Sequence, residues 1–485
     1  MFHNFSNSMT NVEEKALISW IQDIYKHLKL NENNNINVNL FNMEDNILVE
    51  LGILNAAEDL EEFKLFFKKV KGIEYNLFLQ ELKKINHEDR ICIIPKLCKR
   101  CRSILKEEFL SEVNFTLVDL FCGAGGMSLG FNQENFKTIF ANDIEDSCIQ
   151  TYILNHPEVD PSKVVLGDIK NLASTVNTYI EGEQVDVLIG GPPCQGFSLA
   201  NQQRVIDDPR NKLYKEYVSV VNTTRPKFFV MENVEGMKSI ANQIEEDFQN
   251  IGYTVKYQVL NAIDFGVPQN RKRIIFIGNR LDIDNQLLFD ELLQIQNESP
   301  RTTLYDAIHD LPSLEPLRIK NATEHESDEC GRIVVKNLNQ NPNDYIRTIN
   351  NNQNQPYLYN HKSRYNNERD IEIFSRLNQG DKSDDPKIAD IMPYANRNDI
   401  FKDKYFKLVY NAPSKTMTAH MKFDCNMYIH PEQARGLTPR EAARVQSYPD
   451  GYYFKGPFTK TYMQIGNSVP PLMSRKIASV IRKYL

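Results

Sequence analysis

Short apolar runs alternate with helical patterns from Phe115 to about Asn279, and no other feature restricts the possible fold of this chain as much. Each run is rich in β-branched or aromatic residues and stops at Gly, Asp or Asn. This alternation indicates βαβ units, and therefore an open α/β fold with a parallel sheet. Ligands of such sheets bind beyond the carboxyl ends of the strands, so the residues that end each run are candidates for chemistry. The runs are FTLVDLF, KTIFAND, KVVLGD, VDVLIGG, KFFVMEN and RIIFIGN.

Length and composition limit the class of protein and its surroundings. A chain of 485 residues, 41% of them hydrophobic, is long enough for more than one core. Eight cysteines, without an apolar N-terminal run and cleavage site, favour a reducing, cytoplasmic setting. No window of about 18 apolar residues is present, so we expect no membrane span. The net charge of −7 excludes a globally basic nucleic-acid-binding protein and leaves only local cations for phosphates.

The best local cluster of cations is QNRKR, residues 269–273. Such a run is more often a solvated face than a binding site, so its context has to decide. Residues 1–112 are expected to form a helical extension with no motif that indicates a role. Its cysteines have no well-spaced fourth ligand, so we expect no metal site there. These cysteines are Cys92, Cys98 and Cys101.

The chain becomes irregular and rich in Asn, Asp and Gln after about residue 300. This polar composition is typical of a recognition region built from loops. An insertion without a function would have the same composition. A regular helix is expected again after Thr438, which is followed by Pro439 and, three residues past the cap, by Glu441. The last residues, LMSRKIASVIRKYL, also have a helical pattern.

A glycine-rich turn follows the first apolar run, in DLFCGAGGMSLG at residues 119–130. Glycines let the backbone turn tightly and approach a ligand closely. Asp143 ends the second run, where an acid can bind ribose hydroxyls, and Asp168 ends the third, where an acid can accept from an adenine amine. These residues predict an adenosine-containing cofactor. A dinucleotide-dependent oxidoreductase stays an alternative, although the Gly-x-Gly-Gly spacing differs from the usual pyrophosphate turn.

A cysteine and an acid end the next two runs. Cys194 follows VDVLIGGPP, and a Pro-Pro turn beyond a strand makes a rigid platform rather than a core position. A free cysteine is most often an inert, buried thiol. The position of Cys194 directly after the Pro-Pro turn argues against that interpretation. Glu232 ends the run KFFVM and would lie in the same crevice, shielded from water and able to hold a proton.

Six motifs in this order resemble the DNA (cytosine-5) methyltransferase family of bacterial restriction-modification systems: DLFCGAGG, GGPPCQGFS, ENV, QNRKR, LTPREAARVQSYPD and QIGNSVPP. The resemblance covers about residues 115–485. It implies a Rossmann-like sheet that binds S-adenosylmethionine, with a smaller, irregular target-recognition domain. The domains would be the helical extension (1–112), the catalytic and cofactor-binding domain (113–299), the target-recognition region (300–424), a small-domain motif (425–460) and a C-terminal motif (461–485).

The resemblance also implies the reaction, which is transfer of a methyl group to carbon 5 of a cytosine flipped out of duplex DNA. Cys194 would add to carbon 6, Glu232 would protonate or hydrogen-bond ring N3, and Arg271 and Arg273 would hold the base and the adjacent backbone. Gln195 to Ser198 would belong to the loop that closes over DNA. The cofactor site would be formed by Phe121, Gly123, Gly125, Gly126, Asp143, Asp168, Ile169, Leu213, Asn467 and Ser468.

The partners that the resemblance implies are double-stranded DNA and a cognate restriction endonuclease, and the protein is expected to be a monomer. Relatives with the same motifs methylate cytosine in transfer RNA, so RNA stays an alternative substrate. A catalytically silent DNA-binding protein is a further alternative, which the intact thiol, acid and arginines disfavour. The sequence does not indicate which bases are recognised.

Overall fold

The computed structural model describes residues 60–83, 115–193, 213–320, 325–337, 339, 341–355, 357–393 and 404–485, together with residues 18, 21, 22, 25 and 48. The predictions for Cys92, Cys98, Cys101, Cys194, Gln195 and Ser198 lie outside these residues. Contacts divide the chain into two compact units. The first comprises Met1–Val113 and Ile153–Pro161, and the second comprises Asn114–Tyr152 and Ser162–Leu485. The finer division of the second unit stays a prediction.

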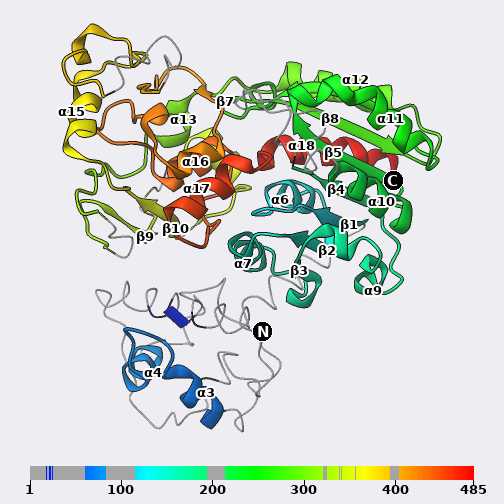
Figure 1. Ribbon diagram of the computed structural model, residues 1–485, viewed down its shortest axis with the longest axis horizontal. Helices are drawn as coiled ribbons and strands as arrows, with labels where there is room; N and C mark the ends of the chain where they lie inside the picture. Colours follow the sequence, from blue (N-terminus) through cyan, green and yellow to red (C-terminus); the bar gives the residue numbers. More distant parts are fainter. Residues whose placement is uncertain are drawn as a thin grey trace. The chain divides into compact units, whose positions relative to one another are not determined.

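A seven-stranded sheet forms the centre of the second unit, in the order β3-β2-β1-β4-β5-β8-β6 (Figure 1). Each of the six apolar runs contains one of its strands, which confirms the predicted α/β fold. The strands are β1 (Phe115–Leu120), β2 (Phe136–Asp143), β3 (Val164–Leu166), β4 (Val187–Gly190), β5 (Phe228–Val234), β6 (Thr254–Asn261) and β8 (Lys272–Asn279).

The predicted parallel sheet is antiparallel at one edge. Strand β8 runs antiparallel to both β5 and β6, between which it lies. Only residues 262–271 connect β6 to β8, which is too short for a parallel crossover, so the chain must return antiparallel. Sequence reasoning missed β6 because its side chains are only partly buried and its apolar pattern is weak.

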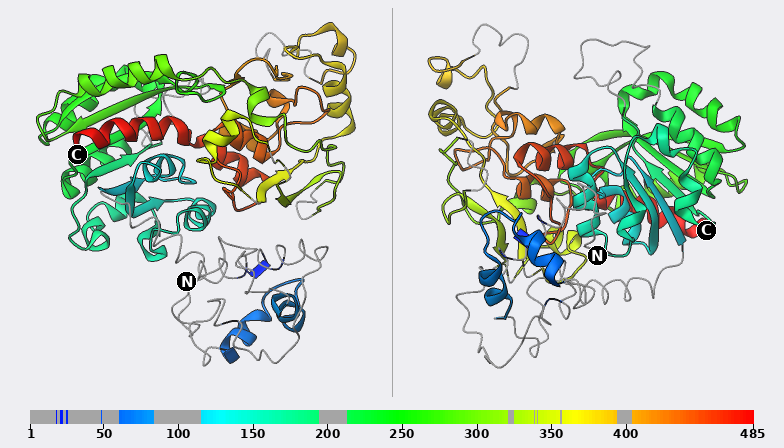
Figure 2. Two further views of the ribbon diagram at one scale, coloured as in Figure 1. Left: turned by 180° about the vertical axis from the view of Figure 1, so that it is seen from behind. Right: turned by 60° about the horizontal axis from the view of Figure 1, so that its bottom comes forward.

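Helices cover both faces of the sheet (Figure 2). Because side chains alternate along a strand, Leu117 and Val118 of β1 enter different hydrophobic clusters on opposite faces. One cluster includes residues of α6 (Gly126–Asn132), α12 (Asn285–Glu298) and α18 (Pro471–Ile481). The other includes residues of α9 (Val176–Ile180), α10 (Leu213–Thr224) and α11 (Ala241–Gln249). Helices α7 (Asp146–Asn155) and α8 (Ile169–Leu172) begin near the carboxyl ends of β2 and β3.

A smaller lobe, built from the elements between α13 and α17, lies beside the sheet (Figure 1). It has few regular elements, as the polar texture after residue 300 predicted. Its helices are α13 (Leu304–Ile308), α14 (Asp344–Ile349), α15 (Glu368–Arg376), α16 (Pro439–Val445) and α17 (Phe458–Asn467). Its strands are the antiparallel pair β9 (Gly331–Lys336) and β10 (Tyr357–Lys362), and β11 (Ser414–Lys415), which pairs in parallel with β7 (Gln269–Asn270).

Helix α16 is buried along its whole length and anchors the smaller lobe. Thr438 and Glu441 form the predicted capping box. The Glu441 carboxylate also binds the Arg435 guanidinium through two bonds of 2.7 and 2.8 Å. Arg444 Nε donates to Asp450 across 2.7 Å. These ion pairs offset the free-energy cost of removing the charged side chains from water.

The described part of the first unit contains helices α3 (Leu60–Phe67) and α4 (Tyr75–Lys83). The two helices meet through aromatic contacts, including a 5.2 Å separation between the ring centroids of Phe67 and Phe78. No described helix is long and apolar enough to cross a membrane.

Candidate active site

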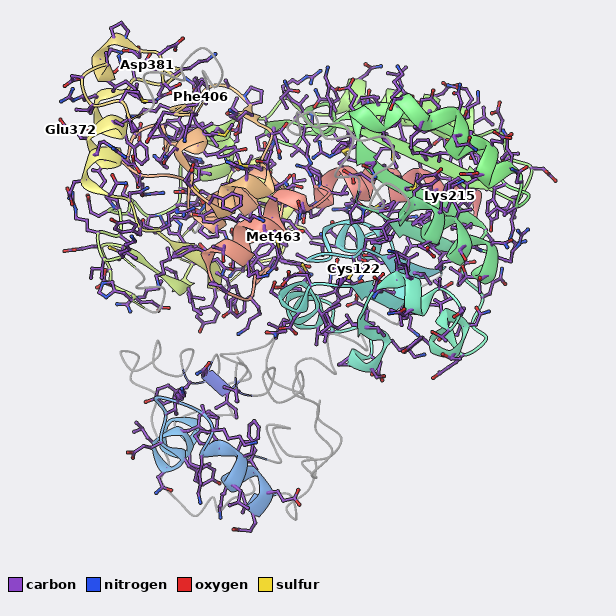
Figure 3. The ribbon with its side chains drawn as sticks, viewed as in Figure 1. Cys122, Lys215, Glu372, Asp381, Phe406 and Met463 are labelled. Atoms are coloured by element: carbon purple, nitrogen blue, oxygen red, sulfur yellow. The ribbon has the colours of Figure 1, made fainter. Side chains whose placement is uncertain are left out.

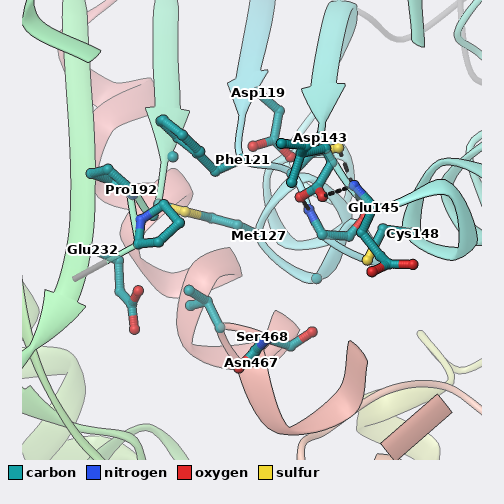
Figure 4. Close-up of a pocket in the computed structure, with 18 of the residues that line it drawn as sticks. Asp119, Phe121, Met127, Asp143, Glu145, Cys148, Pro192, Glu232, Asn467 and Ser468 are labelled. Carbon is teal, nitrogen blue, oxygen red and sulfur yellow. Dashed lines mark hydrogen bonds between the residues drawn. The ribbon is translucent and has the colours of Figure 1, made fainter. Parts of the chain in front are cut away.

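A cavity of about 580 Å³ lies at the carboxyl ends of the strands (Figure 4). It is lined by the turn after β1, by the ends of β2, β3, β4 and β5, and by the end of α17. The fold therefore brings together most of the described site residues that the sequence predicted. Those that line it are Phe121, Gly123, Gly126, Asp143, Asp168, Ile169, Leu213, Glu232, Arg271, Arg273, Asn467 and Ser468.

The glycine-rich turn shapes one wall of the cavity. Phe121 and Gly123 have φ angles of 55° and 52°, and Gly125 has a φ of 82°. This backbone conformation favours glycine, and Phe121 adopts it at the point where the strand turns over the cavity. Gly125 does not line the cavity. It precedes α6 in the left-handed conformation, so its part is to make the turn.

Packing requires a glycine at position 126, apart from its predicted approach to a ligand. A Cβ atom there would meet the Tyr448 hydroxyl and would lie 2.7 Å from the Val469 carbonyl oxygen. Replacing Gly126 by alanine should lower the free energy of unfolding by about 1–3 kcal/mol, because the main chain of Val469 has to move. It should also weaken cofactor binding. Urea denaturation and calorimetry with S-adenosylhomocysteine measure the two effects.

Gly182→Ala is the matched control for Gly126→Ala. Gly182 has a φ of 77° and nothing within 4 Å of the added methyl position. Its replacement should cost only the left-handed backbone strain of about 1–2 kcal/mol and leave the affinity for S-adenosylhomocysteine unchanged. An equal loss of affinity in both variants would contradict the packing argument.

Asp143 ties the ends of β1 and β2 together. Its Oδ2 accepts from Gly123 N and its Oδ1 from Glu145 N, each across 2.8 Å. Burial raises the pKa of this carboxyl group, and the two backbone donors oppose that rise. Asp168 caps α8 and accepts from Lys170 N across 3.0 Å. Both acids therefore stand at fixed positions on the cavity wall.

A deeper acid, Asp119, was not among the predicted site residues. It is 1% exposed, its Oδ2 accepts from the Ser128 hydroxyl, and burial raises its pKa to about 8. The folded protein should therefore hold a proton that the unfolded chain releases near pH 4, so the free energy of unfolding should fall as pH rises from about 4 to 8. Asp119→Asn removes this dependence. Urea midpoints at pH 6 and pH 9 should differ less in the variant than in the wild type; an equal fall would contradict this assignment.

A hydrogen bond holds the chain just before Cys194. Pro192 and Pro193 line the cavity, and Asn233 Nδ2 donates to the Pro192 carbonyl oxygen across 2.7 Å. A Cβ atom on Gly191 would lie 3.1 Å from Glu232 Oε2, so the loop starts directly beside the acid. Cys194 itself lies outside the described residues. Asn233 was missed by sequence reasoning, although it stands in the motif ENV.

Glu232 and Arg273 form an ion pair at the cavity. The carboxylate Oε1 lies 2.8 Å from Arg273 Nε, and Glu232 is 8% exposed. Glu232 lies on β5 and Arg273 on the neighbouring strand β8. The register of these two strands places both side chains on the same face of the sheet. The cation offsets the cost of burying the acid and fixes the direction of its side chain.

Arg271 is placed differently from the prediction that it holds the base. It is 1% exposed, and its guanidinium donates to the carbonyl oxygens of Met417 (2.8 Å), Gly466 (3.2 Å) and Ser468 (2.8 Å). Burial lowers its pKa to about 9. In this arrangement, Arg271 joins the start of β8 to two segments of the smaller lobe, one at Met417 and one at the end of α17. A direct contact with a base stays an untested expectation.

The end of α17 closes the cavity opposite the glycine turn. The Ser468 hydroxyl pairs with the Tyr448 hydroxyl and donates to the Gln464 carbonyl oxygen across 3.1 Å. Tyr452 donates to the Ala124 carbonyl oxygen inside the glycine turn. Sequence reasoning missed both tyrosines, although they stand in or next to the motif SYPD. Their hydroxyls link the segment after α16 to the end of α17 and to the glycine turn.

The cavity suits an adenosine derivative that carries positive charge better than it suits a dinucleotide. The carboxylates of Asp143, Glu145 and Asp168 line it. Of the lining arginines, Arg271 faces carbonyl oxygens and Arg273 faces Glu232, so neither is placed to neutralise a pyrophosphate. Among the described residues, no cluster of His, Cys, Asp or Glu could hold a metal ion.

Comparisons with known proteins agree with this geometry. Residues 115–483 match the family model for C-5 cytosine-specific DNA methylases. Type II methyltransferase M1.HphI of Haemophilus parahaemolyticus is 36% identical, over 76% of this chain and 87% of the relative. Type II methyltransferase M.DdeI of Desulfomicrobium norvegicum is 34% identical, over 76% and 88%. The crystal structure of a prophage-encoded E. coli protein, assigned as a DNA modification methyltransferase, has a TM-score of 0.59 at 24% identity and covers 76% of this chain and 99% of that chain.

Proposed function

The chain belongs to the C-5 cytosine-specific DNA methylases, and on that premise we propose that it methylates carbon 5 through a covalent adduct between Cys194 and a cytosine flipped out of duplex DNA. Membership of the family establishes a DNA cytosine-5 methyltransferase that uses S-adenosylmethionine. The adduct, the flipping and the residue roles are the proposal. Type II relatives also support a place in a restriction-modification system, with a separate endonuclease as the functional companion.

The chemistry needs a nucleophile because carbon 5 of cytosine is itself too weakly nucleophilic. The Cys194 thiolate adds to carbon 6, and the ring electrons move toward carbon 5 while Glu232 protonates or hydrogen-bonds N3. Bound S-adenosylmethionine supplies the electrophilic methyl group. The sulfonium would leave as S-adenosylhomocysteine once carbon 5 has taken the methyl group. A base would then remove the carbon 5 proton, N3 would return its proton to Glu232, and the thiolate would be expelled as the ring is restored. The base must leave the stack because neither ring face is accessible within a duplex.

One observation carries this proposal: the cysteine loop starts beside a buried acid that an arginine holds in place. The Gly191 backbone lies against Glu232 Oε2, and Arg273 Nε lies 2.8 Å from Oε1. Asp143 and Asp168 line the same cavity and would hold the ribose and adenine of the cofactor. Phe121 and Ile169 would contact its adenine. The cofactor and the cytosine would therefore share one cavity.

A duplex containing 5-fluoro-2′-deoxycytidine tests the covalent step. Fluorine cannot leave as the carbon 5 proton does, so the elimination stops and the protein should remain bound to DNA after denaturation. DNA from a host that lacks the modification contains unmethylated target sites. Treating this DNA with the enzyme locates a site that the enzyme methylates. Absence of a trapped species on a duplex that the enzyme demonstrably methylates would remove the covalent mechanism.

Asp143→Asn tests the cofactor site. The amide keeps the size of the side chain but cannot accept from both backbone donors and from ribose hydroxyls at once. The Kd for S-adenosylhomocysteine should rise by about ten- to a hundredfold, as expected for the loss of one or two charge-assisted hydrogen bonds. Isothermal calorimetry measures this change. A Kd within twofold of the wild type would show that the ribose does not bind Asp143.

A further inference from the structure

An ion pair at the edge of the cavity joins two parts of the chain that lie far apart in the sequence. Lys460 Nζ donates to both carboxylate oxygens of Glu145, across 2.8 and 2.9 Å. Glu145 follows β2 and lines the cavity near Asp143 (Figure 4). Lys460 lies in the first turn of α17 and belongs to none of the six sequence motifs. The pair therefore connects the carboxyl end of β2 to the smaller lobe.

Glu145 is held in place by its own neighbours as well as by Lys460. Its backbone N–H donates to Asp143 Oδ1 across 2.8 Å, and the Ser147 hydroxyl donates to its Oε1 across 3.2 Å. Burial alone would raise the pKa of Glu145, but the Lys460 ammonium group holds that pKa below its ordinary value. The Glu145 carboxylate is therefore charged at neutral pH and directed to Lys460, while its main chain fixes the acid proposed to bind ribose.

The chain just before α17 packs against the start of α7. Lys455 N donates to the Thr151 hydroxyl of α7 across 2.8 Å. A Cβ atom on Gly456 would lie 3.1 Å from Lys460 Cβ and 3.7 Å from Ser147 Cβ. The first turn of α17 is therefore packed against the start of α7, and the ion pair lies on the side of the cavity.

Helix α17 forms one wall of the cavity. Its residues Met463 (labelled in Figure 3), Gln464 and Asn467 line the cavity, and so does Ser468 directly after it. A helix of ten residues is a single hydrogen-bonded unit about 15 Å long. A shift of its first turn, which carries Lys460, would therefore move the residues that close the cavity at its end.

The exposure of the pair limits how much it can contribute. The Lys460 side chain is 41% exposed and that of Glu145 is 29% exposed, and ion pairs near water contribute little to the stability of a protein. This pair differs from an ordinary surface pair because it bridges two elements that line the cavity. Its main effect is therefore expected on a ligand held between these elements.

We propose that Glu145 and Lys460 are positioning residues, which hold α17 against the end of β2 and so retain the cofactor in the cavity. The inference rests on the proposed placement of S-adenosylmethionine between these walls. It adds Lys460, which no sequence motif indicated. Neutralising either partner should let the wall formed by α17 move away and should speed release of the cofactor, without removing a group that the covalent mechanism uses.

Binding of S-adenosylhomocysteine to the full-length protein tests the pair. Calorimetry gives the Kd and stopped-flow fluorescence the dissociation rate for the wild type, Glu145→Gln, Lys460→Met and the double variant. Each single variant should raise both quantities by about two- to fivefold, the range expected for one exposed ion pair. The double variant should match the single variants, because the two partners act as a unit. Lys460→Arg keeps the charge and should bind as the wild type does.

Lys483→Met is the matched control for Lys460→Met. Lys483 Nζ lies 2.6 Å from Glu291 Oε2, the Glu291 side chain is 28% exposed, and neither residue lines the cavity. This variant should leave the affinity for S-adenosylhomocysteine unchanged. In turnover, Lys460→Met should raise the KM for S-adenosylmethionine without lowering kcat. A fall in kcat with an unchanged KM would contradict a positioning role.

The outcomes separate this inference from the proposed function. If Asp143→Asn binds S-adenosylhomocysteine as the wild type does, the proposed placement of the cofactor fails. If Asp143→Asn weakens binding and Lys460→Met binds like Lys483→Met, only the role of the ion pair fails. Additive losses in the double variant would also overturn it, since Lys460 would then act without Glu145. Failure of the 5-fluorocytosine trap, with these affinities as expected, would overturn the covalent step alone.

Discussion

Replacing Cys194 by serine should lower the rate of methyl transfer by at least about 10⁴-fold, because a hydroxyl is far less ionised than a thiol near neutral pH and the addition to carbon 6 requires the anion. Binding should survive, since the change removes no charge that meets a phosphate. The same variant should give no trapped complex with 5-fluorocytosine. Single-turnover methyl transfer and anisotropy measure the two quantities on one duplex.

Cys122→Ser is the matched control for the nucleophile. Cys122 lines the cavity, but burial raises the pKa of its thiol far above the usual range, so it cannot serve as a thiolate. Its replacement should leave the 5-fluorocytosine trap intact. If Cys122→Ser abolished trapping and Cys194→Ser did not, the assignment of the nucleophile would be wrong.

Glu232→Gln should lower kcat by about 10²–10⁴-fold, the range for loss of one general acid. The amide can still lie beside Arg273 and N3 of the base, but it cannot deliver a proton. The defect should therefore appear in kcat, with the KM for DNA nearly unchanged. Glu246→Gln, on the exposed face of α11, is the control and should behave as the wild type. A rise in KM alone would make Glu232 a binding residue.

The ion pair between Glu232 and Arg273 leads to a further prediction about catalysis by Glu232. Because Arg273 Nε lies 2.8 Å from Glu232 Oε1, Arg273→Gln should impair catalysis partly through Glu232. The double variant Glu232→Gln/Arg273→Gln should consequently be little slower than Glu232→Gln alone, since groups that act as a unit are not additive. Additive losses in kcat would show that Arg273 acts directly on the substrate.

The predictable parts of the structure were those that local pattern determines. Apolar runs ending in Gly, Asp or Asn located six strands, and the rule that ligands bind beyond their carboxyl ends brought Asp143, Asp168 and Glu232 to one cavity. The capping box at Thr438 was equally local. Strand β6 and the reversed direction of β8 depend on pairing between segments, which no single run encodes.

The roles of individual side chains depended on distant contacts. Gly126 was interpreted as a residue that approaches the ligand, and its neighbours Tyr448 and Val469 come from the far end of the chain. Arg271 stands in a basic run, which suggested an exposed cation, but it is buried against carbonyl oxygens of two other segments. Burial and partner identity at such positions are tertiary properties, so composition and spacing alone could not reveal them.

Nucleoside analysis of methylated DNA tests the central claim most directly. Duplex DNA is incubated with the protein and S-adenosylmethionine that carries an isotopically labelled methyl group, digested to nucleosides and examined by mass spectrometry. The account predicts the label in 5-methyl-2′-deoxycytidine, and its loss with Cys194→Ser. Label in N4-methylcytosine or N6-methyladenine, or in 5-methylcytosine formed equally well by Cys194→Ser, would contradict it.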